Sequence, residues 1–187
     1  VIGRKMYKWP LMVNNITRKD LDFLIEYLKQ DDPKLTHGPM VKKFEALWSE
    51  WLGVKHSIMV NSGASANDLT LLAFSKSFPA AEIIVPPLTW VSDISSVIRA
   101  GLNPVFVDIN FTNLSFDLEK LKDSLTKQTK AIFLTHVLGL NALSDELLNI
   151  ARDHDLMIIE DVCESHGATF NTKKLGSYGF ASNFYFY

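Results

Sequence analysis

Short apolar segments of strand length alternate with segments of helical pattern through most of this chain. Because each helical segment separates two strands, the alternation indicates parallel pairing with right-handed crossovers. We expect strands at 56–61, 82–87, 104–109, 131–137 and 156–162, and helices at about 64–74, 90–100, 118–125 and 145–154. The predicted fold is α/β, with three layers in which helices cover both faces of a mostly parallel sheet.

Two amphipathic helices are expected before this alternation begins. The first spans residues 17–30, starts at a possible Thr17 cap and places four aliphatic side chains on one stripe. The second spans residues 38–52 and carries Trp48 and Trp51 on its apolar face, and Gly53 ends it.

Composition excludes several functional classes. The chain has 187 residues, 47% of them hydrophobic, which fits one ordinary domain with a sizeable core. Its 19 basic and 21 acidic residues give a net charge of -2, so nucleic acid is not an expected partner. Its longest apolar runs are only of strand length, so a membrane is not expected either. The single cysteine, Cys163, excludes an internal disulfide and a zinc site of several thiolates, and no metal is expected. These features favour the cytoplasm.

Ligands of such sheets bind beyond the carboxyl ends of the strands. After the first predicted strand comes a run of small residues, in which Gly63 and Ala64 let the backbone approach a ligand and Ser62 and Ser65 add hydroxyl groups. The following helix directs its positive end to the same place, so the run is a candidate phosphate site. An ordinary strand-to-helix turn with a serine cap has the same pattern.

Trp90 follows the second of these strands. Pro86 and Pro87 end that strand, and Thr89 is expected to cap the next helix, with Trp90 in its first turn. There Trp90 offers a flat face to an aromatic ligand, although a packing role is the common alternative.

Asp161 lies at the carboxyl end of a predicted buried strand, where ligands of such sheets bind. A carboxylate kept ionised there needs a cationic partner, and no basic residue lies nearby in the sequence. Pyridoxal phosphate would use all three features. Its phosphate would bind at residues 62–65, its ring would stack on Trp90, and its protonated nitrogen would pair with Asp161. The alternative is that Asp161 only ties down the loop that follows.

Six segments in order resemble the sugar aminotransferases of the DegT family. They are GPMVKKFEALWSEWLGVKH, VNSGASAN, EIIVPPLTWVS, PVFVDI, THVLG, and IIEDVCESHGATF followed by LGSYG. The resemblance implies a truncated large domain of a fold-type-I pyridoxal-phosphate transferase that acts on a nucleotide-linked ketosugar in polysaccharide or lipopolysaccharide synthesis. It also implies a homodimer with active sites shared across the interface.

The same resemblance assigns residue roles. Gly63, Ala64 and Ser65 would bind the phosphate, Trp90 would stack on the ring and Asp161 would pair with its nitrogen. Glu164 falls close to the cofactor's phenolic oxygen, at a position where many of these aminotransferases carry Gln or His. Asp161 and Glu164 are the candidate catalytic residues.

A related activity stays open. At Glu164, Cys163 and Asn67 the sequence resembles the ketosugar 3-dehydratase branch of the family. Those relatives use pyridoxamine phosphate and carry His in place of the lysine that would bind the cofactor. The deciding position is expected just beyond Tyr187. A nucleotide-binding oxidoreductase is disfavoured by the missing glycine fingerprint, and a non-catalytic binding module on the same fold is a further alternative.

The expected organisation is an N-terminal helical segment at 1–34 and an incomplete cofactor-binding domain at 35–187. The chain starts on Val1 and stops within an aromatic run, so we expect a fragment that lacks the C-terminal small domain and is inactive alone. Of the remaining residues, Glu160 and His136 are expected to be structural, and His166 is a candidate substrate contact.

Overall fold

The structure is a computed structural model that describes residues 14–186. It forms two compact units, Val1–Lys43 and Phe44–Tyr187, which are described here one at a time. Within the described residues no helix combines the length and the apolar character needed to cross a bilayer.

The first unit contains helix α1, Arg18–Leu28, and the beginning of α2, Pro39–Leu52. Thr17 caps α1 as expected. Its backbone N–H donates to the Asp20 carboxylate at 2.7 Å, and the Asp20 N–H donates back to the Thr17 hydroxyl at 3.3 Å. This reciprocal capping box satisfies two donors that a helix start otherwise leaves unpaired. Both predicted amphipathic helices are therefore confirmed.

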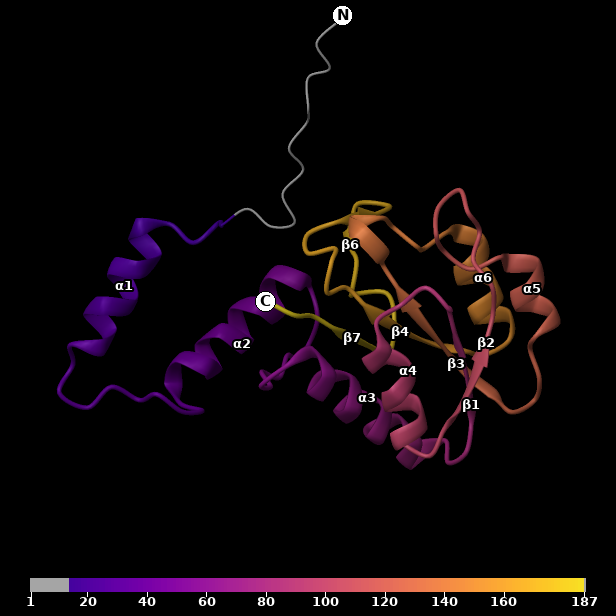
Figure 1. Cartoon of the computed structure of the whole chain (residues 1–187), viewed down its shortest axis with the longest axis horizontal. Coiled ribbons are helices and arrows are strands. Elements are labelled where there is room, and N and C mark those ends of the chain that lie inside the picture. The colour runs from indigo at the N-terminus through magenta and orange to yellow at the C-terminus, as the bar shows by residue number, and fades with distance from the viewer. Residues whose placement is uncertain (1–13, 187) are drawn as a thin grey trace, which may run out of the picture. The chain divides into compact units, whose positions relative to one another are not determined.

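A five-stranded parallel sheet organises the second unit (Figure 1). Its strands follow the order β2-β1-β3-β4-β7, and each neighbouring pair is parallel. Their bounds are β1 Glu82–Val85, β2 Asn103–Phe106, β3 Thr129–Thr135, β4 Met157–Asp161 and β7 Ala181–Asn183. The predicted parallel α/β fold is confirmed.

Helices cover both faces of this sheet. In Figure 1, α3 and α4 lie on one side and α5 and α6 on the other. Their bounds are α3 Gly63–Ser77, α4 Val91–Arg99, α5 Leu118–Asp123 and α6 Asp145–Asp153. A short 3-10 turn, η1 Val137–Gly139, follows β3, and a small hairpin of β5 Thr169–Phe170 and β6 Lys173–Lys174 follows β4.

Successive strand residues supply two separate cores because side chains alternate between the faces of a sheet. Phe133 and Ile159 pack in the core that α3 and α4 cover, together with Phe74. Ile132 and Ile158 pack in the opposite core, together with Leu147 of α6. Burying each such side chain contributes roughly 1.5–3 kcal/mol. Both faces of the central strands are therefore apolar until the strands reach their carboxyl ends.

The strand predicted at 56–61 is wrong. These residues form no ladder with any strand in the described part of the chain. Ile58 is 79% exposed, and the Met59 N–H donates to the Glu45 carboxylate at 2.8 Å instead of to a neighbouring strand. A strand is stable only when its backbone groups are paired, and that pairing is missing here.

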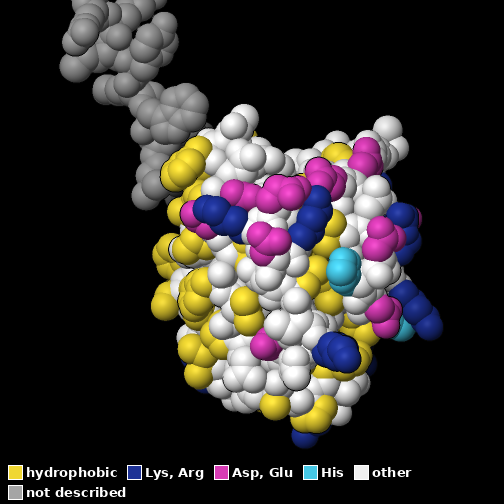
Figure 2. Space-filling view, turned by 90° about the vertical axis from the view of Figure 1, so that its right-hand side faces the viewer, with side chains coloured by type: hydrophobic (Ala, Val, Ile, Leu, Met, Phe, Trp, Pro, Cys, Tyr) yellow, Lys and Arg dark blue, Asp and Glu magenta, His cyan; other side chains and the backbone are white. Residues whose placement is uncertain are grey.

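The face that includes α5 and α6 is charged but balanced. Figure 2 shows acidic and basic side chains next to one another in its upper half. Among the ion pairs of these helices, Lys122 lies 2.8 Å from Glu119 and 2.9 Å from Glu146. Exposed pairs of this kind contribute little to stability, so this face adds solubility more than fold.

Candidate cofactor site

The carboxyl ends of three adjacent strands meet at one edge of the sheet. In the parallel register, Asp161 of β4 lies beside Thr135 of β3 on one side and Asn183 of β7 on the other. Three polar residues therefore end adjacent strands at the same edge of the sheet, and this edge is where ligands of open α/β sheets bind.

The serine turn, residues 62–65, begins α3. Ser62 is the N-cap: its hydroxyl accepts from the Ser65 N–H at 3.1 Å and donates to the Ser65 hydroxyl at 3.1 Å. The N–H groups of Gly63 and Ala64 make no hydrogen bond within residues 14–186. Two open donors at a helix N-terminus, with hydroxyl groups beside them, fit the donor set that a phosphate requires.

Trp90 is the N-cap of α4 and is 71% exposed, so its ring is available to a ligand. The predicted Thr89 cap is wrong. The Thr89 hydroxyl instead donates to the carboxylate of Asp93 in the first turn of the helix. Trp90 consequently precedes the first turn of α4 and does not lie within it.

Asn67 joins the elements that carry the predicted site residues. Its side chain is 2% exposed and donates to the Ser92 hydroxyl at 3.1 Å and to the Asp93 carboxylate at 2.7 Å. Its carbonyl oxygen accepts from the Asn183 amide at 2.8 Å, and the Thr70 hydroxyl holds the other end of that amide, also at 2.8 Å. These bonds hold α3, which begins at the serine turn, against α4, which follows Trp90, and against β7, the strand beside Asp161.

Asp161 is 5% exposed at the end of β4. One carboxylate oxygen accepts from the Cys163 N–H at 2.8 Å, so this side chain does tie down the following loop. Within residues 14–186 no lysine or arginine forms an ion pair with it. Asp161 therefore combines the loop-tying contact with a buried carboxyl group that has no lysine or arginine partner among the residues described.

Asp93 is a buried acid that sequence reasoning missed. It is 1% exposed, and it accepts from the hydroxyl of Thr135, the residue beside Asp161 in the strand register. Burial, followed by the charge of Asp161, raises the pKa of Asp93 to about 8. An acid in the first turn of a helix is commonplace, so only its position beside a second carboxylate distinguishes it.

The loop after β4 holds three further residues. Glu164 is exposed, and its carboxylate accepts from the Leu138 N–H at 2.6 Å, which ties the loop to η1. Burial raises the pKa of the Cys163 thiol. Burial lowers the pKa of His166, whose ring packs against Phe184 and Phe186. All three residues lie in the segment between Asp161 and the β5–β6 hairpin.

Glu160 and His136 are structural, as expected. Glu160 is fully buried and accepts from the N–H groups of Gly176, Tyr178 and Gly179. His136 Nδ1 accepts from a backbone N–H at 3.1 Å, so its Nε2 carries the proton and donates to Glu160 at 3.2 Å. Of the two adjacent acids that end β4, one anchors a loop and the other reaches the ligand edge.

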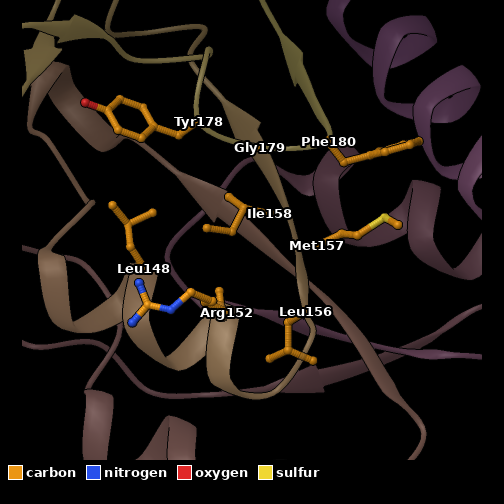
Figure 3. Close-up of a pocket in the computed structure, with 9 residues that line it drawn as sticks. Leu148, Arg152, Leu156, Met157, Ile158, Tyr178, Gly179 and Phe180 are labelled. Carbon is orange, nitrogen blue, oxygen red and sulfur yellow. The ribbon is translucent and has the colours of Figure 1, made fainter.

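An open hollow lies at the opposite end of β4 (Figure 3). It is lined by Met157 and Ile158 at the start of the strand, by α6 and by the segment around Gly179. Arg152 is its only charged lining residue, and the other side chains are mostly apolar. Its position away from the carboxyl ends separates it from the candidate site.

Residues 15–187 match the model of the DegT/DnrJ/EryC1/StrS aminotransferase family. The chain belongs to this family. No group of three or more His, Cys, Asp or Glu among residues 14–186 is arranged to hold a metal ion.

Two curated relatives represent two activities. The chain is 36% identical over 184 residues to the GDP-4-keto-6-deoxy-D-mannose 3-dehydratase of Yersinia pseudotuberculosis, covering 96% of this chain and 46% of that protein. It is 39% identical over 150 residues to the GDP-perosamine synthase of Caulobacter vibrioides, covering 80% of this chain and 40% of that protein. The chain thus spans less than half the length of these relatives.

A solved structure of the E. coli GDP-4-keto-6-deoxy-D-mannose-3-dehydratase, with hydrated PLP bound, has the same fold. The TM-score is 0.84 at 34% identity, and the match covers 93% of this chain and 46% of that one. The α/β architecture described above is therefore that of a pyridoxal-phosphate protein in the same family.

Proposed function

We propose that this chain is part of a pyridoxal-phosphate-dependent aminotransferase that acts on a nucleotide-linked ketosugar in polysaccharide or lipopolysaccharide synthesis. The observation that carries the proposal is the placement of Asp161. It is a buried carboxyl group without a basic partner in residues 14–186, and its strand neighbour Asn183 is hydrogen-bonded to Asn67 of the helix that begins at the serine turn. A bound cation of the right shape would complete this site. Family membership supports the choice of cofactor.

The residues present fit pyridoxal phosphate. The N–H groups of Gly63 and Ala64 and the hydroxyl groups of Ser62 and Ser65 would hold its phosphate, and exposed Trp90 would stack on its ring. Asp161 would accept a hydrogen bond from the protonated ring nitrogen. When bound, the cofactor supplies an electron sink, which a protonated ring nitrogen strengthens.

We assign Glu164 to the neighbourhood of the cofactor's phenolic oxygen. Its exposed carboxylate already accepts the Leu138 N–H, which would orient it toward η1 and limit its motion. An acid here would hold or move a proton at that oxygen, and Asp161 would hold the proton at the ring nitrogen. These two residues are our proposed catalytic residues.

Dehydration at the C3 carbon of the sugar is the alternative activity. Glu164, Cys163 and Asn67 favour it, and 3-dehydratases are among the relatives at 36% identity. That reaction would use the pyridoxamine form of the cofactor. We also propose that residues 35–187 belong to the cofactor-binding domain, preceded by an N-terminal helical segment, and that the protein works as a cytoplasmic homodimer.

One experiment tests the function and separates the two activities. The full-length protein is mixed with pyridoxal phosphate, GDP-4-keto-6-deoxy-D-mannose and L-glutamate, and the product is analysed by mass spectrometry. A GDP-linked amino sugar supports transamination, and a GDP-sugar that has lost a hydroxyl group supports dehydration. If the protein does not change the absorption spectrum of pyridoxal phosphate, the proposal is wrong and a non-catalytic binding module becomes the better explanation.

A further inference from the structure

We propose that Asp93 is a positioning residue of the cofactor site, a neutral carboxylic acid that donates a hydrogen bond to the Asp161 carboxylate. This inference rests on the proposed function, because it assigns a partner to the carboxylate that would hold the cofactor ring. It concerns the proton on the Asp93 carboxyl group, which is present before any cofactor binds.

The contacts of Asp93 supply no positive charge. Its Oδ1 accepts from the Asn67 amide at 2.7 Å, and its Oδ2 accepts from the hydroxyl groups of Thr89 and of Thr135, the latter at 3.2 Å. All three donors are neutral, and the side chain is 1% exposed. An ionised carboxylate buried among neutral donors carries a large desolvation penalty, which protonation removes.

The second carboxylate strengthens this conclusion. Asp161 lies beside Thr135 in the strand register, and the Thr135 hydroxyl donates to Asp93, so the two carboxyl groups are neighbours at this edge of the sheet. Asp161 raises the pKa of Asp93, and a hydrogen bond between two carboxyl groups requires that one of them carries a proton. Two further titratable groups face the pair. They are Cys163, whose pKa is raised, and His166, whose pKa is lowered, so both are neutral near neutral pH. The pair therefore carries one negative charge in total.

One shared proton suits the proposed ligand. A single negative charge matches a single ring cation, whereas two ionised carboxylates would repel each other when the ring is absent. The hydrogen bond from Asp93 would also orient the Asp161 carboxylate, and Asn67 holds Asp93 in place for this purpose. Asp93 thus prepares the acceptor without touching the cofactor.

Infrared spectroscopy of the cofactor-free, full-length protein tests the proton directly. We expect the carbonyl band of a protonated carboxylic acid at neutral pH, and we expect this band to disappear as the pH rises through about 8. Asp93→Asn should remove the band. A band that survives unchanged in this variant, or that is absent from the unmodified protein at neutral pH, would overturn the inference.

A second variant keeps the test decisive if Asp93→Asn does not fold. Asp161→Asn removes the neighbouring charge, so the Asp93 band should disappear at a lower pH than in the unmodified protein. An unchanged midpoint would mean that the two carboxyl groups do not interact, and the inference would fail.

A cofactor measurement separates this inference from the proposed function. Pyridoxal phosphate labelled with 15N in its ring reports by NMR whether the ring nitrogen is protonated. Because Asp93→Asn keeps a neutral donor beside Asp161, we expect a protonated nitrogen in both proteins at neutral pH. Loss of that proton in the variant would show that Asp93 acts as a second negative charge, contrary to the inference. If the unmodified protein binds no cofactor, the proposed function fails, while the infrared result still decides the protonation of Asp93.

Discussion

Asn67 and Asn183 are 116 residues apart in the sequence, yet the Asn183 amide donates to the Asn67 carbonyl oxygen at 2.8 Å. This hydrogen bond joins the helix that begins at the serine turn to the strand beside Asp161. Both side chains are buried, so water cannot replace either partner. The relative placement of the phosphate end and the ring end of the candidate site depends on this pair.

Asn67→Ala should destabilise the full-length protein by about 2–4 kcal/mol, because it removes the acceptor of the buried Asn183 NH2 group and the amide donor to Asp93 Oδ1. Urea unfolding measures the change. Lys76→Ala, at an exposed position of the same helix, is the control and should change stability by less than about 0.5 kcal/mol. Equal effects of the two substitutions would mean that the Asn67 contacts contribute nothing specific.

Asp161→Ala should reduce turnover by about 100-fold or more, since it removes the charge partner of the proposed ring cation. Steady-state kinetics with the nucleotide-linked ketosugar of the proposed reaction measures the loss, and circular dichroism checks the fold. Asp123→Ala, at an exposed acid of α5, should keep normal activity. Normal turnover of the Asp161 variant would remove the basis of the proposed cofactor contact.

Trp90→Ala should weaken pyridoxal-phosphate binding by roughly tenfold and leave stability nearly unchanged, because the ring is exposed and its stacking is worth about 1.4 kcal/mol. Trp48→Ala should do the opposite, since the Trp48 ring packs against Trp51, Phe184 and Phe186. Absorption titration and thermal unfolding separate the two effects. A large stability loss in the Trp90 variant would assign that residue to packing.

Glu160→Gln should cost about 3 kcal/mol of folding stability, because the amide puts an N–H group where backbone N–H groups now donate to a carboxylate. Glu164→Gln is the matched comparison. Its exposed side chain should change stability by under about 1 kcal/mol while reducing activity. Denaturant unfolding and kinetics together distinguish the anchoring acid from the proposed catalytic one.

The raised pKa of Asp93 makes stability depend on pH in a defined direction. The folded state holds the proton up to pH about 8, whereas the unfolded state loses it near pH 4, so raising the pH across this window favours unfolding. This contribution is complete below the unfolded pKa and is lost as the pH rises through the folded pKa. Its slope is at most about 1.4 kcal/mol per pH unit.

Asp93→Asn removes that proton equilibrium and should flatten the dependence. Thermal unfolding at several pH values across the window measures the difference between the two proteins. Identical slopes in both would mean that Asp93 is already ionised in the folded state.

Four strands of the sheet, β1 to β4, could be predicted because their signals are local, whereas β7 was not among the expected strands. Apolar runs such as 156–159 are too short for helices and are flanked by helical segments, which indicates buried parallel strands. Period-two alternation likewise separated Glu160 from Asp161. The roles of Ser62, Trp90 and Glu164 stay predictions, since they concern a bound group.

The contacts that assemble the site could not be predicted, because they join distant residues. Asn67 meets Asp93 and Asn183 only through tertiary packing, and no local pattern identifies such partners. The strand at 56–61 failed for a related reason: its local pattern is suitable, but strand formation requires a neighbour. Local patterns thus located the edge of the sheet but not the polar network behind it.

The parallel arrangement of the sheet also sets the order in which its strands can pair during synthesis. Each strand of this sheet must wait for an intervening segment before its next neighbour exists, and β4 and β7 come last in the sequence among its five strands. Asp161 gains its neighbour Asn183 only when β7 has emerged. A nascent chain paused before β7 would therefore expose an unfinished sheet edge, which is the stage at which a chaperone would be most useful.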